Sequence, residues 1–481
     1  MTSWLARTKA LPARAEAFAW ARATSLAWVL ALVLALTFAP EAQAQTSPSM
    51  AALSLESAWR AALANDPTLR AARAAALSGQ EQVPQARSQL LPQVSLSLGA
   101  AENKLDTTTP DPSGAPFERK QRYSSNTASI SVRQPLFQFA QRATLRLAEA
   151  QVAETDAVLV QARQELASRL AQAYFELLLA DDQIALVRAQ TSAHTTQFDA
   201  AKKSLAAGSG VRTDIDEAQA RLDLDAAQAL EGQQQRTLSR RRLQQLVGQA
   251  FAEIRPLDVQ LLHRNPPQPG EFGGWLALAE QQSPELWAVR ARSDAARAAV
   301  DRARARHMPT LDVVGQAGRG TSDDVNRIYG RTNSFSLGLQ LTLPLYSGGA
   351  IDSGVRQALA EQTRADEALA ALRLDLELRL YREHRGVTEG LLRIKALEQA
   401  VGSSEQAVQS SRRSYLAGIR TTLDVLNAEQ QLATTQRDLS QARYAVLLSF
   451  VRLQSLAGVF DDTRLAQLDG WLSVSLPTAS P

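Results

Sequence analysis

The feature that most constrains the fold is an internal repeat, because the second half of the chain reproduces the motifs of the first half in the same order. Asn65-Asp66-Pro67 in the first half corresponds to Gln282-Ser283-Pro284 in the second. The same spacing aligns further residues without a gap: Arg73 with Arg290, Arg87 with Arg304, and Pro92 with Pro309. The repeat therefore predicts two equivalent halves, residues 45–264 and 275–457, joined by a Pro/Gly-rich linker at 265–274.

Each half contains two stretches that favour helices far longer than those of an ordinary globular domain. Residues 141–206 contain no proline or glycine and are rich in Ala, Leu, Gln, Glu and Arg, which are good helix formers. At 1.5 Å per residue this helix would be roughly 100 Å long. The other long helices are predicted at 214–247, 353–416 and 422–457. Helices of this length must pack as coiled coils.

Alternating apolar and polar residues predict two β-strands in each half, at about 92–102, 124–136, 309–320 and 332–345. Apolar-out, polar-in strands of about ten residues are typical of outer-membrane barrels, although a half-buried sheet of a soluble domain gives the same pattern. The polar segments between paired strands, 103–123 and 321–331, are predicted to be exterior loops.

Four strands cannot close a barrel alone, and an open sheet edge is not tolerated in lipid. If these strands lie in a membrane, several chains must therefore share one barrel. Apart from the N-terminal segment, no stretch is long and apolar enough to cross as a helix.

The N-terminal segment, residues 1–44, has the three parts of an export signal. Basic residues precede an apolar run from Leu26 to Phe38, and Ala42-Gln43-Ala44 follows as a small-x-small cleavage site. The apolar run is shorter than the roughly 20 residues of a membrane-spanning helix, so we expect a signal peptide rather than an anchor.

Composition excludes several functions. Lys+Arg is 52 and Asp+Glu is 49, and this balance gives no basis for a nucleic-acid partner. The absence of cysteine excludes disulfides, thiolate metal sites and thiol nucleophiles. The four histidines are scattered, and no nucleophile, base and orienting group occur together, so we expect neither an enzyme nor a cofactor.

The doubled order of helix, strand, strand, long helix, turn and helix resembles the TolC family of outer-membrane channels. The most specific marks are Asn65-Asp66-Pro67, Pro135-Leu136-Phe137, Pro344-Leu345-Tyr346 and the segment 415–428. The resemblance implies a mainly α-helical protein with a small β part. It implies a homotrimer in which three chains of four strands form a 12-stranded barrel in outer-membrane lipid, above a tunnel of coiled-coil helices across the periplasm.

The resemblance also places a constriction at the periplasmic entrance, at Thr213, Asp214, Tyr415, Arg420, Asp424 and Asn427. Asn427 departs from the family, which has an acidic ring at this position. Local roles compete with this assignment, because Thr213 and Asp214 suit a helix N-cap and Asp424 suits the first turn of a helix. Arg420 at a helix start is disfavoured by the helix dipole, which makes a partner on another helix attractive.

The implied partners are a periplasmic adaptor and an inner-membrane transporter of the ABC type, with an exported protein or a small molecule as cargo. The adaptor is expected to dock at two tight turns, at Gly208, Ser209, Gly210, Gly418 and Ile419. Many drug-efflux members carry a lipidated N-terminal cysteine, so its absence favours type I protein secretion, of the RTX-toxin or cyclolysin kind, over multidrug efflux. A periplasmic coiled-coil scaffold without a pore is the alternative of a different class. No role is predicted for the C-terminal tail, 458–481.

Overall fold

The computed structural model describes residues 52–110, 112–324 and 327–473, with backbone alone at 323–324 and 327–329. The predicted signal peptide lies outside the described residues. The first half contains α2 (Leu55–Asn65), α3 (Pro67–Gln80), α4 (Gln82–Ser88), β1 (Gln93–Pro110), β2 (Pro116–Phe137), α5 (Phe139–Ala206), α6 (Arg212–Val247) and α7 (Val259–Arg264). The second half contains α8 (Phe272–Gln282), α9 (Pro284–Ala305), β3 (Thr310–Asp324), β4 (Arg327–Thr342), α10 (Ala350–Leu416), α11 (Thr422–Leu456) and α12 (Asp462–Asp469).

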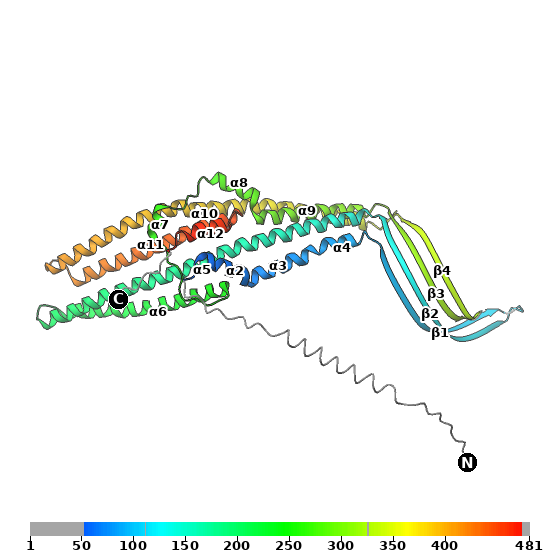
Figure 1. Cartoon of the computed structure of the whole chain (residues 1–481), viewed down its shortest axis with the longest axis horizontal. Helices are drawn as coiled ribbons and strands as arrows, with labels where there is room; N and C mark the ends of the chain where they lie inside the picture. The colour runs from blue at the N-terminus through cyan, green and yellow to red at the C-terminus, as the bar shows by residue number, and fades with distance from the viewer. Residues whose placement is uncertain (1–51, 111, 325–326, 474–481) are drawn as a thin grey trace, which may run out of the picture. The chain divides into compact units, whose positions relative to one another are not determined.

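The two halves repeat the same elements, and the repeat is visible in the local backbone. Asp66 and Ser283 are both extended, with φ/ψ of −61°/119° and −63°/119°, and each precedes a proline at the first position of a helix. Proline suits that position because its missing N–H would have no helical partner. In Figure 1, α6 lies along α5 and α11 lies along α10, which gives two long helical hairpins.

The four strands form one antiparallel sheet in the order β1-β2-β3-β4. The predicted loops at 103–123 and 321–331 are wrong, because β1 and β2 continue to Pro110 and from Pro116, and β3 and β4 continue to Asp324 and from Arg327. Polar residues can extend a ladder when they pair across it, as Asn103 does by donating to Ser125 Oγ at 2.9 Å.

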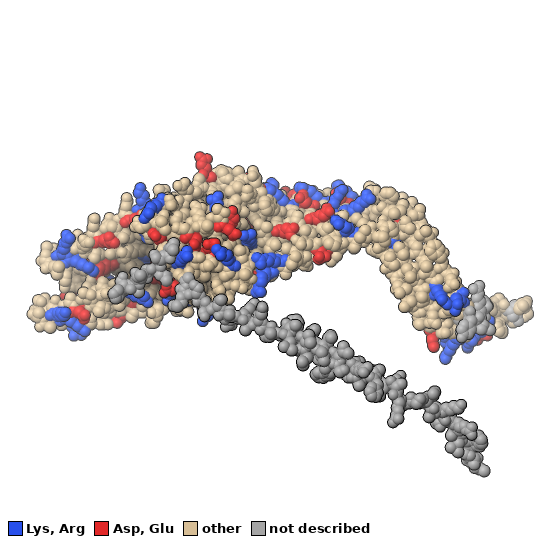
Figure 2. Space-filling model, in the orientation of Figure 1, with Lys and Arg blue, Asp and Glu red and all other residues tan. Residues whose placement is uncertain are grey.

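The two faces of the sheet differ in polarity. One face carries exposed apolar side chains, among them Val94, Leu96, Phe335, Leu337 and Leu339. Figure 2 shows that the strands carry few charges over most of their length, whereas Lys and Arg gather towards the β1–β2 turn. On the other face Ser95 and Ser131 hydroxyls lie 2.6 Å apart.

The main hydrophobic core lies where α2, α5, α6, α11 and α12 meet, around Trp59, Leu170 and Tyr174. Burial raises the pKa of the Tyr174 hydroxyl, which donates to the Leu53 carbonyl at 3.0 Å. Among the described residues, no helix combines the length and apolar character needed to cross a membrane.

The predicted C-terminal tail is instead folded up to residue 473. Trp471 is buried in the core and donates to the Asn265 carbonyl at 2.8 Å. Asp469 accepts the Leu55 amide at 2.9 Å, which joins α12 to the start of α2. The sequence alone does not predict this segment, because its apolar residues complete a core built by distant helices.

Candidate functional site

Each helical hairpin ends in a turn of the same geometry. In the α5–α6 turn Gly208 has φ +75° and the Ser209 amide donates to the Ser204 carbonyl at 3.0 Å. In the α10–α11 turn Gly418 has φ +73° and the Ile419 amide donates to the Ser414 carbonyl at 2.9 Å. Both glycines are needed for the left-handed conformation, which other residues adopt only at a cost. The structure thus has tight turns where the sequence predicts them.

The turns present apolar side chains to solvent. Leu416 is 84% exposed, Ile419 is 78% exposed and Val211 is 57% exposed. Large apolar groups at a hairpin end contribute nothing to the core of the single chain. They therefore suit a contact with another protein chain, as the docking prediction requires.

The two hairpins differ at the start of their second helix. Thr421 caps α11 by accepting the Asp424 amide, and Asp424 accepts the Thr421 amide at 3.0 Å in return. In α6 the cap residue is Val211, which has no side-chain acceptor. The interpretation of Thr213 and Asp214 as the N-cap is therefore wrong, because the helix begins at Arg212 and both residues lie in its first turn.

Asp424 is held in its ionised form. The amide and hydroxyl of Thr421 donate to its carboxylate, and these bonds together with the nearby Arg420 charge lower the pKa of Asp424 below its ordinary value. Asp424 therefore lies in the first turn, as its local interpretation expects, and completes a reciprocal cap that the sequence analysis did not identify.

Arg420 has its partner within its own hairpin. Its Nη1 donates to Ser411 Oγ on α10 at 2.7 Å, and Ser411 is buried. Arg420 forms no hydrogen bond or ion pair with Thr213 or Asp214 in the described part of one chain. The predicted polar tie from Arg420 to the neighbouring helix pair is therefore absent within the single chain, and its role at the entrance stays a prediction.

The other two predicted entrance residues lie between hairpins. Asn427 Oδ1 accepts from Arg221 Nη2 at 3.1 Å, which joins α11 to α6. Tyr415 lines a cavity of about 520 Å³ between α5 and the α10–α11 hairpin, with Gln197 and Arg412 also in its wall.

A polar cluster with a buried centre, which the sequence does not predict, lies along the hairpins beyond these turns. His194 of α5 lies beside Asp225 of α6 and Glu429 of α11, and Glu429 is also bonded to Gln197 of α5 and Arg412 of α10. Nothing in the local sequence marks these residues, because the five side chains come from four different helices.

A second polar link joins the hairpins nearer the core. Tyr444 of α11 donates to Asp182 Oδ2 of α5 at 2.8 Å. Burial raises the pKa of Asp182, and burial together with the adjacent Asp182 charge raises the pKa of Tyr444. Tyr444 is buried, whereas Asp182 keeps an exposed edge, so this link between α5 and α11 lies at the margin of the core.

The chain thus consists of two long hairpins with matched turns, attached to a four-stranded sheet with an apolar face. Known proteins share this arrangement. The model of the outer membrane efflux protein family matches residues 58–249 and 275–459. The chain belongs to this family.

Individual proteins similar to this outer membrane efflux protein support the same family assignment. The alkaline protease secretion protein AprF of Pseudomonas aeruginosa is 33% identical over 416 residues, which cover 86% of each chain. The outer membrane protein TolC of Vibrio cholerae is 29% identical over 443 residues, which cover 91% of this chain and 98% of TolC. The crystal structure of the outer membrane protein VceC from Vibrio cholerae has a TM-score of 0.71 at 23% identity, covering 85% of this chain and 97% of VceC.

Family membership confirms the TolC resemblance, the mainly helical fold with four strands, and the location in the outer membrane. The entrance and docking roles of individual residues, and the specific partners, stay predictions.

Proposed function

We propose that this outer membrane efflux protein is the exit duct of a three-part export system. Three copies form one barrel and one tunnel, and cargo passes from an inner-membrane transporter and its periplasmic adaptor to the exterior. The chain acts as a passive conduit and catalyses no reaction.

The open four-stranded sheet carries this proposal. β1 and β4 are the outer strands of the sheet and leave unpaired backbone groups along both edges. The exposed face of the same sheet is apolar, which suits lipid. Unpaired edges cannot stand in lipid, and joining equivalent edges of several chains removes them.

We propose an exported protein as the cargo, delivered by an ABC transporter. This proposal is supported by the likeness to AprF, whose name assigns it to the secretion of an alkaline protease. The description of the family as efflux proteins supports small toxic compounds as the second candidate.

Two measurements test the duct. Mass measurement of the detergent-purified protein after crosslinking should give three chains, and the same material should conduct ions in a planar bilayer. A lipid-inserted monomer would contradict the proposal.

Deletion of the gene distinguishes the two cargoes. Loss of an extracellular protein with unchanged antibiotic susceptibility is expected for protein secretion. Increased susceptibility with an unchanged set of extracellular proteins would favour efflux.

A further inference from the structure

The buried polar cluster joins all four long helices at one level. His194 Nδ1 of α5 lies 2.6 Å from Asp225 Oδ2 of α6, and its Nε2 lies 3.9 Å from Glu429 Oε2 of α11. Glu429 accepts from Gln197 Nε2 at 2.6 Å and from Nε and Nη2 of Arg412, on α10, at 3.0 and 2.6 Å.

The centre of the cluster is buried, so the charge it carries matters. The side chains of His194 and Asp225 are 3% and 4% exposed and that of Glu429 is 10% exposed, whereas Arg412 reaches the surface and is 55% exposed. A buried charge is costly unless an opposite charge is close. Two carboxylates face one guanidinium here, so the charges balance when the imidazole carries its proton.

Protonation also decides which bonds the imidazole can make. A protonated ring donates from both nitrogens, whereas a neutral ring donates from one and presents a lone pair at the other. The neutral form can keep its bond to Asp225 but then directs that lone pair at the Glu429 carboxylate. Only the protonated form attracts both carboxylates.

The two carboxylates belong to different hairpins. Asp225 lies in the α5–α6 hairpin with His194, and Glu429 lies in the α10–α11 hairpin with Arg412. The His194–Glu429 contact therefore crosses between hairpins, and the Gln197–Glu429 bond crosses beside it. The proton on His194 strengthens the link between hairpins without changing the number of contacts inside either one.

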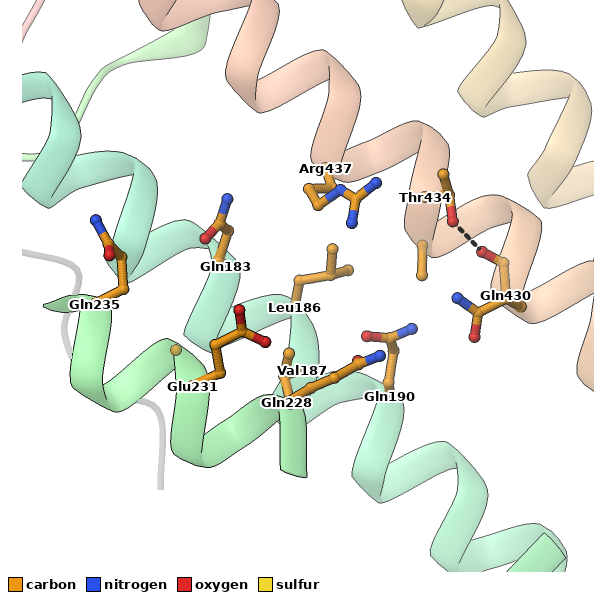
Figure 3. Close-up of a pocket in the computed structure, with 12 residues that line it drawn as sticks. Gln183, Leu186, Val187, Gln190, Gln228, Glu231, Gln235, Gln430, Thr434 and Arg437 are labelled. Carbon is orange, nitrogen blue, oxygen red and sulfur yellow. Dashed lines mark hydrogen bonds between the residues drawn. The ribbon is translucent and has the colours of Figure 1, made fainter. Parts of the chain in front are cut away.

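A polar cavity lies close to the cluster, on the side away from the hairpin turns. Figure 3 shows Gln190, Gln228 and Gln430 around a cavity of about 450 Å³, which Glu231 and Arg437 also line. Gln190 and Gln228 are one helical turn from His194 and Asp225, and Gln430 follows Glu429. A polar cavity of this size admits water, and the exposed Arg412 brings the other side of the cluster to the surface, so solvent lies close to the imidazole on both sides.

We propose that His194 is a positioning residue whose protonated form holds the two hairpins together, so that the periplasmic end of the duct opens more readily as pH rises. Histidine is the side chain that ordinarily changes charge between pH 5 and 8. This inference rests on the proposed duct function. It adds a pH response and assigns that response to one buried residue.

Single-channel recordings in planar bilayers between pH 5.5 and 8.0 test the proposal. The open fraction of the wild-type trimer should rise about tenfold over this interval, because the neutral imidazole loses its ionic attraction to Glu429, 3.9 Å away. His194→Asn retains an amide donor towards Asp225 but cannot titrate, so its open fraction should be high and independent of pH. Glu429→Gln should also lose most of the pH response.

His263 provides a matched control. It also faces a carboxylate, with Nε2 2.8 Å from Glu398 Oε1, but its side chain is 50% exposed and lies on the short helix α7. His263→Asn should keep the full pH response. A flat wild-type profile, or a wild-type slope in His194→Asn, would overturn the proposal.

A second measurement separates this inference from the duct itself. The chain has no cysteine, so Ser209→Cys and Ile419→Cys place spin labels at the two hairpin ends alone. In trimers assembled with excess unlabelled chain, the distance between labels should increase from pH 5.5 to 8.0, and His194→Asn should abolish the change. If the distance depends on pH in a protein that does not conduct ions, the duct function is rejected and the His194 link between hairpins is retained. A distance that stays constant with pH would reject the His194 link.

Discussion

Arg420 Nη1 donates a 2.7 Å hydrogen bond to Ser411 Oγ, which joins the start of α11 to the final turns of α10. This bond gives an arginine at a helix start a partner, since the helix dipole alone disfavours a positive charge there. It also opens two explanations for any gating role of Arg420. The residue either stiffens its own hairpin through Ser411 or reaches Thr213 and Asp214 of a neighbouring chain.

Each explanation predicts a different second variant that should have the same effect on conductance as Arg420→Ser. A hydrogen bond to a charged group contributes roughly 1.5–3 kcal/mol, so Arg420→Ser should raise single-channel conductance in either case. If Arg420 acts between chains, Asp214→Asn should reproduce the increase and Ser411→Ala should not. If it acts within the hairpin, Ser411→Ala should reproduce it. Native conductance in Arg420→Ser would show that the entrance is held elsewhere or is open at rest.

The Asp182–Tyr444 contact predicts a pH-dependent contribution to stability. Burial raises the pKa of Asp182, so the folded state binds this proton more tightly than the unfolded state does. The stabilisation is fully present below the unfolded pKa of about 3.9, and it is lost as pH rises through the higher folded pKa.

Asp182→Asn tests this contribution, because asparagine still accepts from Tyr444 but cannot ionise. The melting temperature of the variant should equal or exceed that of the wild type at pH 7. As pH falls to 4, the melting temperature of the wild type should gain relative to that of the variant. Tyr444→Phe should instead destabilise the protein at pH 7 by about 0.5–1.5 kcal/mol, since it removes the hydrogen bond while water can still reach the Asp182 carboxylate. A constant difference between wild type and Asp182→Asn across this range would contradict the assigned cause.

The two faces of β4 predict opposite responses to an added charge. Leu337 lies on the apolar face and Ser336 on the other, and both are exposed in the single chain. If the apolar face meets lipid, Leu337→Arg should destabilise the folded protein in bilayers by about 2–4 kcal/mol. Ser336→Arg should cost much less, because its side chain points into the lumen. Equal costs, measured by urea unfolding in lipid vesicles, would show that the face is misassigned.

Sequence patterns predicted the elements of this fold better than their contacts. The absence of proline and glycine from 141–206 indicates the helix that the structure gives as Phe139–Ala206, because local propensity accumulates over many turns. Gly418 likewise indicates its turn from local sequence alone, because glycine readily adopts the positive φ found there. The strand ends were misjudged, since polar residues such as Asn103 stay in the ladder through pairing that local composition does not record.

The site was only partly predictable, because its contacts join residues far apart in the sequence. His194 and Asp225 are 31 positions apart, and Gln197 and Glu429 are 232 apart. Their meeting depends on how α5, α6 and α11 rotate against one another, which periodicity leaves undetermined in helices with many alanines. The TolC resemblance identified Arg420 and Asn427 but could not supply their intrachain partners, Ser411 and Arg221.

The hairpin turns predict a local block of secretion, and the chain offers a matched control for it. Gly418 and Gly114 both have positive φ, at +73° and +89°, and a side chain at either position would meet open space. Gly418→Trp and Gly114→Trp should therefore carry a similar backbone strain of about 1–2 kcal/mol. Gly114 lies in the β1–β2 turn, in the sheet rather than at a hairpin end.

If the adaptor docks at the hairpin ends, Gly418→Trp should reduce export of the cargo and weaken copurification of the adaptor, with trimer yield unchanged. Gly114→Trp should leave both export and copurification at the wild-type level. Gly208→Trp should resemble Gly418→Trp, because its turn repeats the same geometry in the other hairpin. Normal export from a chain that carries both hairpin substitutions would place the docking surface elsewhere on the helices. A loss that Gly114→Trp shared would instead trace the effect to backbone strain.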